Sequence, residues 1–193
     1  MIEIIQKIKL KIQKIFFIIF YTSSFKSFGK RSTFVFPFRI NGAKFISVAE
    51  KVHINEGAWM MALKNSKKDP VISIGSGSYI GRSVHIVAVN RIDIKDNVAM
   101  ADKVYITDNA HNYEDINTLM KEQEILDFGP VVIGENTWLG ENSCIMGASI
   151  GKHCVIGVNS VVTSDIPDYS IAVGSPARVI KQYNFETKKW EKR

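Results

Sequence analysis

The sequence lacks the features that mark several large classes of protein. It has only two cysteines, Cys144 and Cys154, and we interpret them as small packing residues of a cytoplasmic protein rather than a disulfide or metal pair. The longest uninterrupted apolar run near the N-terminus, residues 15–21, is far too short to span a bilayer. No small-residue cleavage site follows that run, so we do not expect a signal peptide.

A basic stripe on the folded body is also missing. The net charge is +6, but six lysines against one glutamate fall in residues 1–30, and six basic against two acidic residues fall in residues 178–193. The body between these segments is therefore slightly acidic. A nucleic-acid-binding protein is expected to carry its basic residues on a folded face, so we exclude nucleic acid as a partner.

What the sequence has in abundance is a six-residue repeat. Residues 133–161 read IGENTW, LGENSC, IMGAS, IGKHCV and IGVNSV, and Val162 follows. The third unit, residues 145–149, is one residue short. A fixed short period predicts an all-β fold, a parallel β-helix in which stacked coils bury their apolar edges together. The period alone does not set the handedness, and right-handed crossovers are the general rule for parallel strands.

The same pattern occurs earlier in the chain, with interruptions. Three breaks separate the blocks: a turn-rich stretch at 61–70, a two-residue excess between Ile86 and Ile94, and a long break beginning at Thr107. We therefore expect one β-helix domain. The predicted boundaries are a helix and linker at 1–30, the β-helix at 31–182 with an inserted loop at 107–130, and a basic tail at 183–193.

The first twenty-one residues predict a basic amphipathic helix. Lys7, Lys11 and Lys14 fall on one side of it. Isoleucines mark the other side, at positions 4, 5, 8, 12, 15 and 19. Such a helix suits a membrane surface that carries anionic lipid. Packing on the β-helix or on a neighbouring subunit is the equal alternative.

The long break carries the main candidate for chemistry. It begins with the residues TDNAH, which end at His111, and an acidic stretch follows at 112–129. Long loops inside a compact solenoid often carry function, and histidine is the usual group that removes a proton at neutral pH. His111 is therefore a candidate general base, and the loop a polar flap over its site.

Four motifs in order give the sequence a family resemblance. They are residues 106–111, ITDNAH; 129–140, GPVVIGENTWLG; 156–167, IGVNSVVTSDIP; and 172–181, AVGSPARVIK. Together they resemble the hexapeptide-repeat acetyltransferases, in the branch of the maltose, galactoside and polysaccharide O-acetyltransferases. The match covers residues 45–182.

The resemblance implies a left-handed β-helix that assembles as a homotrimer, with acetyl-CoA in a groove between adjacent subunits. It implies acetyl transfer to a sugar hydroxyl, in cell-surface polysaccharide synthesis, with His111 as the base and no acyl-enzyme. No metal is expected. A cytoplasmic protein whose basic helix contacts the inner membrane face would fit an acceptor held there.

The partners of His111 are less defined. Asp93, Asp96 or Asp108 is each a candidate to orient its ring, and a backbone carbonyl is the alternative. The family's acceptor-binding asparagine lies thirty residues before the histidine. Ungapped counting reaches Gly81 there, which leaves Asn90 as the nearest amide; His85 is a further candidate at the border of the acceptor pocket.

The resemblance also implies a set of donor-binding residues. Arg178 and Lys181 match the basic residues that meet the phosphates of CoA. Thr163 and Ser164 match the polar pair beside the adenosine, and backbone groups near Ala148 and Ser160 line the pantetheine arm. The short unit 145–149 falls close to this groove.

Other interpretations remain open at this level. The scaffold also hosts N-acetylation of amino sugars and O-acetylation of antibiotics, and a solenoid that only binds or assembles is the non-enzymatic alternative. A zinc site of the carbonic-anhydrase kind needs a closely spaced histidine pair, which His111 lacks, so we reject it. The aromatic residues Trp59, Tyr79 and Trp138 suit subunit contacts, a groove wall or a sugar face.

Overall fold

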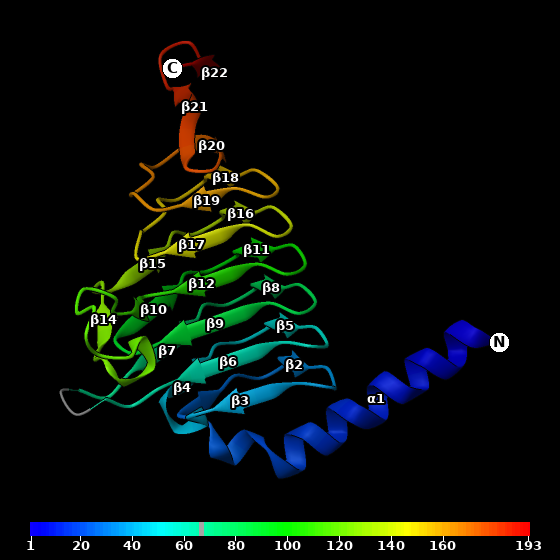
Figure 1. Ribbon diagram of the computed structural model, residues 1–193. Coiled ribbons are helices and arrows are strands. Elements are labelled where there is room, and N and C mark those ends of the chain that lie inside the picture. Colours follow the sequence, from blue (N-terminus) through cyan, green and yellow to red (C-terminus); the bar gives the residue numbers. More distant parts are fainter. Residues whose placement is uncertain (66–67) are drawn as a thin grey trace.

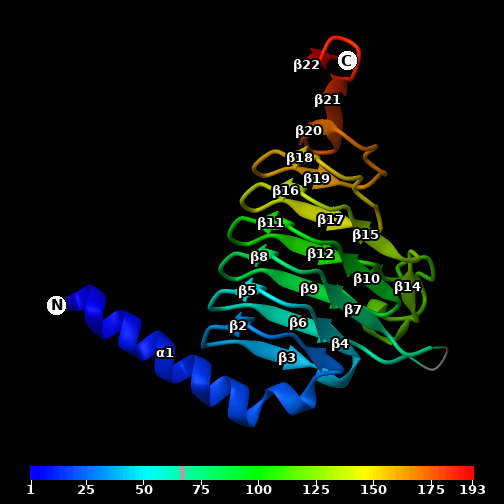
Figure 2. The same ribbon diagram turned by 180° about the vertical axis from the view of Figure 1, so that it is seen from behind.

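The computed structural model, which describes residues 1–65 and 68–193, consists of one helix followed by a stack of coils. The coils from β1 to β17 contribute one short strand each to three sheets, in which the strands of successive coils run parallel (Figure 1). The chain rises from the N-terminal coil in a left-handed sense, and the view from behind shows the same continuous stack (Figure 2). The predicted all-β, left-handed parallel β-helix with an N-terminal helix is therefore confirmed.

The three sheets run along the axis of the stack. Sheet A contains β1 (Ser27–Phe28), β4 (Ile46–Val48), β7 (Val71–Ile74), β10 (Arg91–Ile94) and β15 (Val131–Ile133). Sheet B contains β2 (Thr33–Phe34), β5 (His53–Ile54), β8 (Tyr79–Ile80), β11 (Ala99–Met100), β16 (Trp138–Leu139), β18 (Val155–Ile156), β20 (Ser170–Gly174), β21 (Ala177–Asn184) and β22 (Lys189–Lys192). Sheet C contains β3 (Arg39–Asn41), β6 (Trp59–Ala62), β9 (His85–Ala88), β12 (Tyr105–Thr107), β17 (Cys144–Met146) and β19 (Val161–Val162).

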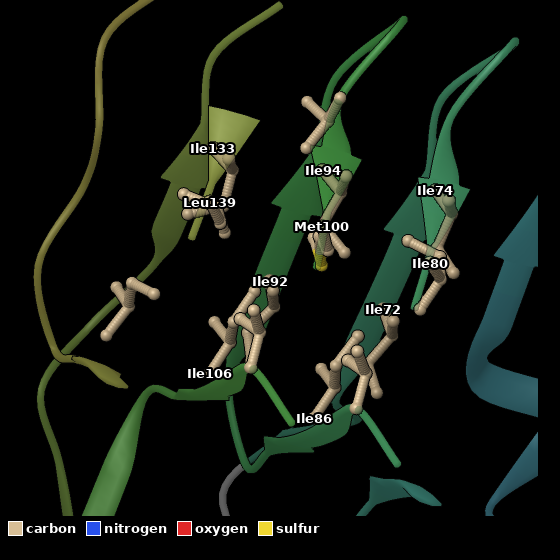
Figure 3. Packing of buried hydrophobic residues seen from close by; sticks show 14 of the residues in the cluster. Ile72, Ile74, Ile80, Ile86, Ile92, Ile94, Met100, Ile106, Ile133 and Leu139 are labelled. Carbon is tan, nitrogen blue, oxygen red and sulfur yellow. The ribbon is translucent and has the colours of Figure 1, made fainter. Parts of the chain in front are cut away.

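The aliphatic residue that opens each hexad forms the core. These side chains point inward from all three sheets and stack on their counterparts one coil away, as Ile74 does on Ile94 and Ile86 on Ile106 (Figure 3). All four are at most 2% exposed. The period therefore gives the wall its stability, because truncating one buried isoleucine costs about 2–5 kcal/mol.

Two of the three corners are tight turns. Each contains a residue in the left-handed conformation, with φ between 53° and 78°. At the corner between sheets A and B these residues are Arg31, Lys51, Gly77, Asn97, Asn136, His153 and Tyr169, and between sheets B and C they are Gly57, Ser83, Lys103, Asn142 and Asn159. Asparagine and glycine adopt this conformation at little cost, which explains why they recur at fixed places in the hexads.

All the breaks in the repeat fall at the third corner, between sheets C and A. Residues 63–70, 89–90, 108–130 and 147–149 each connect a sheet C strand to the next sheet A position. Residues 66 and 67 of the first break lie outside the described residues. The short unit is absorbed at this corner too, since Ile145 and Ile150 on either side of it remain fully buried. We call this edge the C–A corner.

The two ends of the β-helix are closed differently. Helix α1 (Ile2–Phe20) meets the first coil through Phe17, which packs among the rings of Phe25, Phe34 and Phe38, whereas the rest of α1 extends away from the stack (Figure 1). At the other end β20, β21 and β22 form an antiparallel meander, so residues 183–193 continue a folded hairpin. No helix among the described residues has the length and apolarity to cross a membrane.

Candidate functional site

The long insertion at the C–A corner folds into an arm. Its first strand, β13 (Asn109–His111), pairs antiparallel with β14 (Ile125–Asp127), and a 3-10 turn, η3 (Met120–Glu122), lies between them. His111 pairs with Ile125 in this ribbon, and its side chain is exposed. The candidate base thus lies at the far end of a hydrogen-bonded strand rather than on an unstructured loop.

Asp108 fixes the root of the arm. It is fully buried, and its carboxylate accepts hydrogen bonds from the backbone N–H groups of Val89, Asn90 and Arg91 at 2.9, 2.9 and 2.8 Å. The side chain of Asn109 donates a further bond to it at 3.0 Å. A buried carboxylate with this many donors holds two neighbouring coils together at the point where the arm begins.

The returning strand is tied to the two preceding coils. The carboxylate of Asp127 accepts a hydrogen bond from Asn90 Nδ2 at 2.9 Å and forms an ion pair with Lys68 Nζ at 2.9 Å. Although partial burial raises the pKa of Asp127, the bonds from Asn90 and Lys68 lower it overall. The arm therefore lies over the C–A corner of the coils below it. Sequence reasoning noted Asp127 only as one acid among several in the loop, because its partners lie 37 and 59 residues away.

The base of the arm also rests on the short unit. Gly147 has φ of +60°, and a Cβ atom there would meet the ring of Phe128 at 2.6 Å. Its N–H donates to the carbonyl of Thr107 at 2.9 Å. Gly147, at the shortened corner 147–149, thus leaves room for the ring of Phe128.

The three carboxylates predicted to orient His111 have other partners. Asp96 lies at the corner between sheets A and B, where it accepts from the N–H of Ser76 at 2.7 Å. Asp93 lies on the outer face of sheet A and binds Ser73 and Arg91. Asp108 is occupied as described above. In the described part of the chain none of them hydrogen-bonds the imidazole of His111, so the group that orients the ring stays a prediction.

Of the acceptor candidates, the structure brings Asn90 to the arm and leaves His85 apart from it. His85 lies on the outer face of sheet C, stacked on Trp59 with ring centroids 4.2 Å apart and beside Tyr105 at 5.1 Å. Burial lowers the pKa of His85 below its ordinary value. Among the described residues, neither His85 Nε2 nor Trp59 Nε1 has a hydrogen-bond partner, although both atoms are buried.

The donor-binding candidates divide into three places. Thr163 and Ser164 are exposed at the C–A corner one coil above the buried Ala148. Ser160 lies at the corner between sheets B and C, where its Oγ accepts from the N–H of Gly174 at 3.2 Å. Arg178 and Lys181 lie farther along the axis, on β21. Within one chain the structure therefore groups Ala148, Thr163 and Ser164 on the edge that carries the arm and separates Ser160 from them.

The two cysteines and the aromatic residues Tyr79 and Trp138 were also named from the sequence. Cys144 and Cys154 are free, and burial raises the pKa of both thiols. Tyr79 stacks on His53, with ring centroids 5.6 Å apart, and Trp138 is 45% exposed on sheet B. In the ranges 1–65 and 68–193, no group of three or more His, Cys, Asp or Glu is placed to hold a metal ion.

Comparison with known proteins agrees with this fold. Residues 130–164 match the family model described as the hexapeptide repeat of succinyl-transferase. WbbJ of Escherichia coli K12, designated a lipopolysaccharide biosynthesis O-acetyl transferase, is 38% identical over 129 residues, which cover 63% of this chain and 66% of that protein. The chain spans less than two thirds of the length of such curated relatives.

Solved structures extend the comparison. A maltose O-acetyltransferase from Clostridium difficile 630 is 30% identical, with a TM-score of 0.58 over 83% of this chain and 71% of that one. AntD, an N-acyltransferase from Bacillus cereus solved with dTDP and 3-hydroxybutyryl-CoA, has a TM-score of 0.72 over 86% of this chain and 87% of that one. Its identity is 20%, so it supports the fold alone. With the hexapeptide wall, the arm at the C–A corner and these relatives together, the chain belongs to the hexapeptide-repeat acetyltransferase family.

Proposed function

We propose that this protein transfers an acetyl group from acetyl-CoA to a hydroxyl of a sugar, within cell-surface polysaccharide synthesis. The observation that carries the proposal is the position of His111 on a two-stranded arm rooted by Asp108 at the C–A corner. Thr163 and Ser164, the candidates for the donor, lie on the same edge. The names of the relatives, lipopolysaccharide and maltose O-acetyltransferases, support a sugar acceptor.

In this proposal His111 removes the proton of the acceptor hydroxyl. The resulting alkoxide oxygen attacks the thioester carbonyl, and a tetrahedral oxyanion forms. Backbone N–H groups stabilise that oxyanion. The C–S bond then breaks, the ester forms, and the CoA thiolate takes the proton from His111. Holding both substrates on one edge removes much of the entropic barrier, because the reaction becomes effectively unimolecular.

Donor binding is assigned to the C-terminal part of the chain. Arg178 is exposed on β21, and its Nη1 donates to the carbonyl of Ala177 at 2.9 Å, which leaves further guanidinium donors for a phosphate. Lys181 adds a second positive charge on the same strand. The CoA and acyl-CoA complexes of structural neighbours with this fold are consistent with such a donor.

The acceptor is expected beside the arm, where Asn90 is fixed by its bond to Asp127. The orientation of His111 is left to a backbone carbonyl, which was the alternative to the three carboxylates.

The transfer can be tested directly by following free thiol. The protein is incubated with acetyl-CoA and a panel of neutral sugars, amino sugars, oligosaccharides and nucleotide sugars, and the products are analysed by mass. We expect acceptor-dependent thiol release and a mass gain of one acetyl group on a hydroxyl. Transfer to an amine alone would replace the O-acetyl proposal by N-acetylation. No release with any acceptor, despite binding of acetyl-CoA, would leave a binding solenoid.

We further propose that the protein works as a homotrimer with sheet C in the subunit interface. Trp59, His85, Tyr105 and Met146 lie on the outer face of this sheet. The buried nitrogen atoms Trp59 Nε1 and His85 Nε2 have no hydrogen-bond partner in the described residues. The outer face of sheet A carries polar residues instead, such as Ser47 and Asp93. An apolar outer face with unsatisfied buried nitrogens is typical of a surface that a partner covers.

Tyr105→Glu is expected to break this trimer, because it introduces a charge into an apolar interface. Light scattering during size-exclusion chromatography should show the mass of three chains for the wild type and of one chain for the variant. Ser47→Glu, which adds the same charge to the outer face of sheet A, is the control and should remain trimeric. A trimeric Tyr105→Glu variant would exclude sheet C from the interface.

For location, we propose the cytoplasm at the inner face of the membrane. The basic helix at residues 1–21 supports this contact, and the acceptor would be held at the same surface.

A further inference from the structure

Helix α1 has a face that the rest of the chain leaves uncovered. Six isoleucines lie along this face: Ile4, Ile5, Ile8, Ile12, Ile15 and Ile19. They are between 51% and 65% exposed. The side of α1 toward the β-helix is a different one, since Leu10 and Gln13 line the space beside Val35, and Phe17 is buried. At 100° per residue these two sides lie on nearly opposite faces of the helix.

Within one chain, the structure shows which side of α1 packs on the β-helix. The isoleucine side chains are exposed, whereas α1 packs on the first coil mainly through Phe17 and through Phe16, whose ring lies beside that of Phe36. In the view of Figure 1 the N-terminal part of the helix extends away from the stack. An exposed apolar face of this size on a soluble chain marks an interaction surface.

The charges of the helix indicate the kind of partner. Lys9 lies on one flank of the isoleucine face, and Lys7, Lys11 and Lys14 lie on the other. The only acidic residue of the helix is Glu3. Within the described residues none of these lysines forms an ion pair. Lysines that flank an apolar face can keep their ammonium groups in the headgroup layer while the face enters the acyl boundary.

The first coil continues the positive charge. Lys26, Lys30 and Arg31, which follow α1 in the chain, are exposed. A second copy of the chain would present the same lysines along its own helix, so pairing two such faces would bring like charges together. An anionic lipid surface complements both the isoleucine face and its basic flanks.

The attachment of α1 is firm. Phe17 contacts six aromatic rings, and these belong to the end of the helix and to the first coil: Tyr21, Phe25, Phe28, Phe34, Phe36 and Phe38. Such a cluster holds the helix at a set angle to the β-helix axis, unlike a flexible tether. Docking the helix would therefore also set the orientation of the C–A corner relative to the surface.

From these observations we propose that α1 docks on the surface of an anionic lipid bilayer with its isoleucine face inserted and Lys7, Lys9, Lys11 and Lys14 at the headgroups, and that the Phe17 cluster orients the enzyme on that surface. The inference deepens the location given under the proposed function, but it rests on α1 alone and does not need acetyl transfer to be tested.

Co-sedimentation of the full chain with vesicles tests the proposal. One probe is vesicles of phosphatidylcholine alone, which carry no net charge. The other is vesicles of phosphatidylcholine with about 30% phosphatidylglycerol, which carry the negative surface charge of an anionic membrane. We expect binding to the anionic vesicles only. Ile8→Asp with Ile12→Asp should weaken this binding at least about tenfold, because two apolar anchors are lost and two like charges are added. Each of Lys7→Gln and Lys11→Gln should weaken it about fivefold.

The control is Val158→Asp with Phe185→Asp, which adds the same charge at exposed apolar residues far from α1 and should bind vesicles as the wild type does. Thermal unfolding shows whether each variant is folded. Absence of wild-type binding, equal binding to neutral vesicles, or a change of oligomeric mass in the Ile8→Asp, Ile12→Asp variant would overturn the proposal, the last by identifying a subunit contact. Thiol release with a soluble acceptor is measured in a separate assay. Failure of vesicle binding therefore does not affect the test of acetyl transfer, and failure of acetyl transfer does not affect the test of vesicle binding.

Discussion

Replacement of His111 by alanine is expected to lower kcat for acetyl transfer by about 10²–10⁴-fold, the usual contribution of a general base. A sugar hydroxyl attacks a thioester poorly until its proton is removed, and the exposed imidazole at the end of β13 is the group we assign to remove it. The dissociation constant of acetyl-CoA should change little, because the donor-binding candidates are other residues, among them Thr163, Arg178 and Lys181. Rate assays of thiol release measure kcat, and calorimetric titration with acetyl-CoA measures the dissociation constant.

A matched pair of variants separates chemistry from a general effect of losing a histidine. His111→Asn should lose activity as His111→Ala does, since an amide is not a base. His153→Asn makes the same change at a turn between sheets A and B, where φ is +54° and asparagine is well tolerated. It should retain the activity of the wild type. If kcat of His111→Ala is unchanged, or if it falls only in proportion to the loss of acetyl-CoA binding, His111 is not the base.

Asp108→Ala is expected to destabilise the protein by about 2–5 kcal/mol, because it leaves several backbone N–H groups at the C–A corner without an acceptor. Those of Val89, Asn90 and Arg91 lose their bonds together. The midpoint of urea unfolding should fall accordingly. The arm also loses its root, so kcat should fall in the folded fraction, although Asp108 does not touch His111.

Asp102 provides the comparison for this prediction. It lies at the corner between sheets B and C, accepts one backbone bond from Arg82 at 2.7 Å, and is more exposed. Asp102→Ala should cost less than about 1 kcal/mol, as exposed ion pairs and single surface bonds usually do. Similar destabilisation by both variants would mean that the cluster around Asp108 has no special role in holding the arm.

The sequence predicted the wall of this fold well, since the inward residue of each hexad is set by a period that any coil must keep. Its first coil was harder to recognise. Phe28 and Phe34 stand in register with the aliphatic residues Val48 and Ile54 of the next coil, because this coil also has to bury Phe17 of α1. The helix itself was predicted from its periodicity, but which side of it would face the β-helix depended on that aromatic cluster.

The candidate site was predictable only in part. The break in the repeat identified the loop and His111, whereas the roles of Asp108 and Asp127 depend on which backbone groups fold against them. Asp108 lies three residues before His111 and was a natural choice to orient it, yet the coil below offers it three N–H donors. Asn90 was reached through its amide type, but its partner Asp127 could not be inferred from spacing.

The confinement of every irregularity to the C–A corner has a consequence for how such a chain can change. The connection between sheets C and A contains as few as two residues at 89–90 and as many as twenty-three at 108–130, yet Ile86, Ile106 and Ile133 are equally buried. Length is therefore uncoupled from core packing along one seam of the molecule. Segments grafted or deleted at that seam can remodel the surface around the arm while the remaining two edges keep every coil in phase.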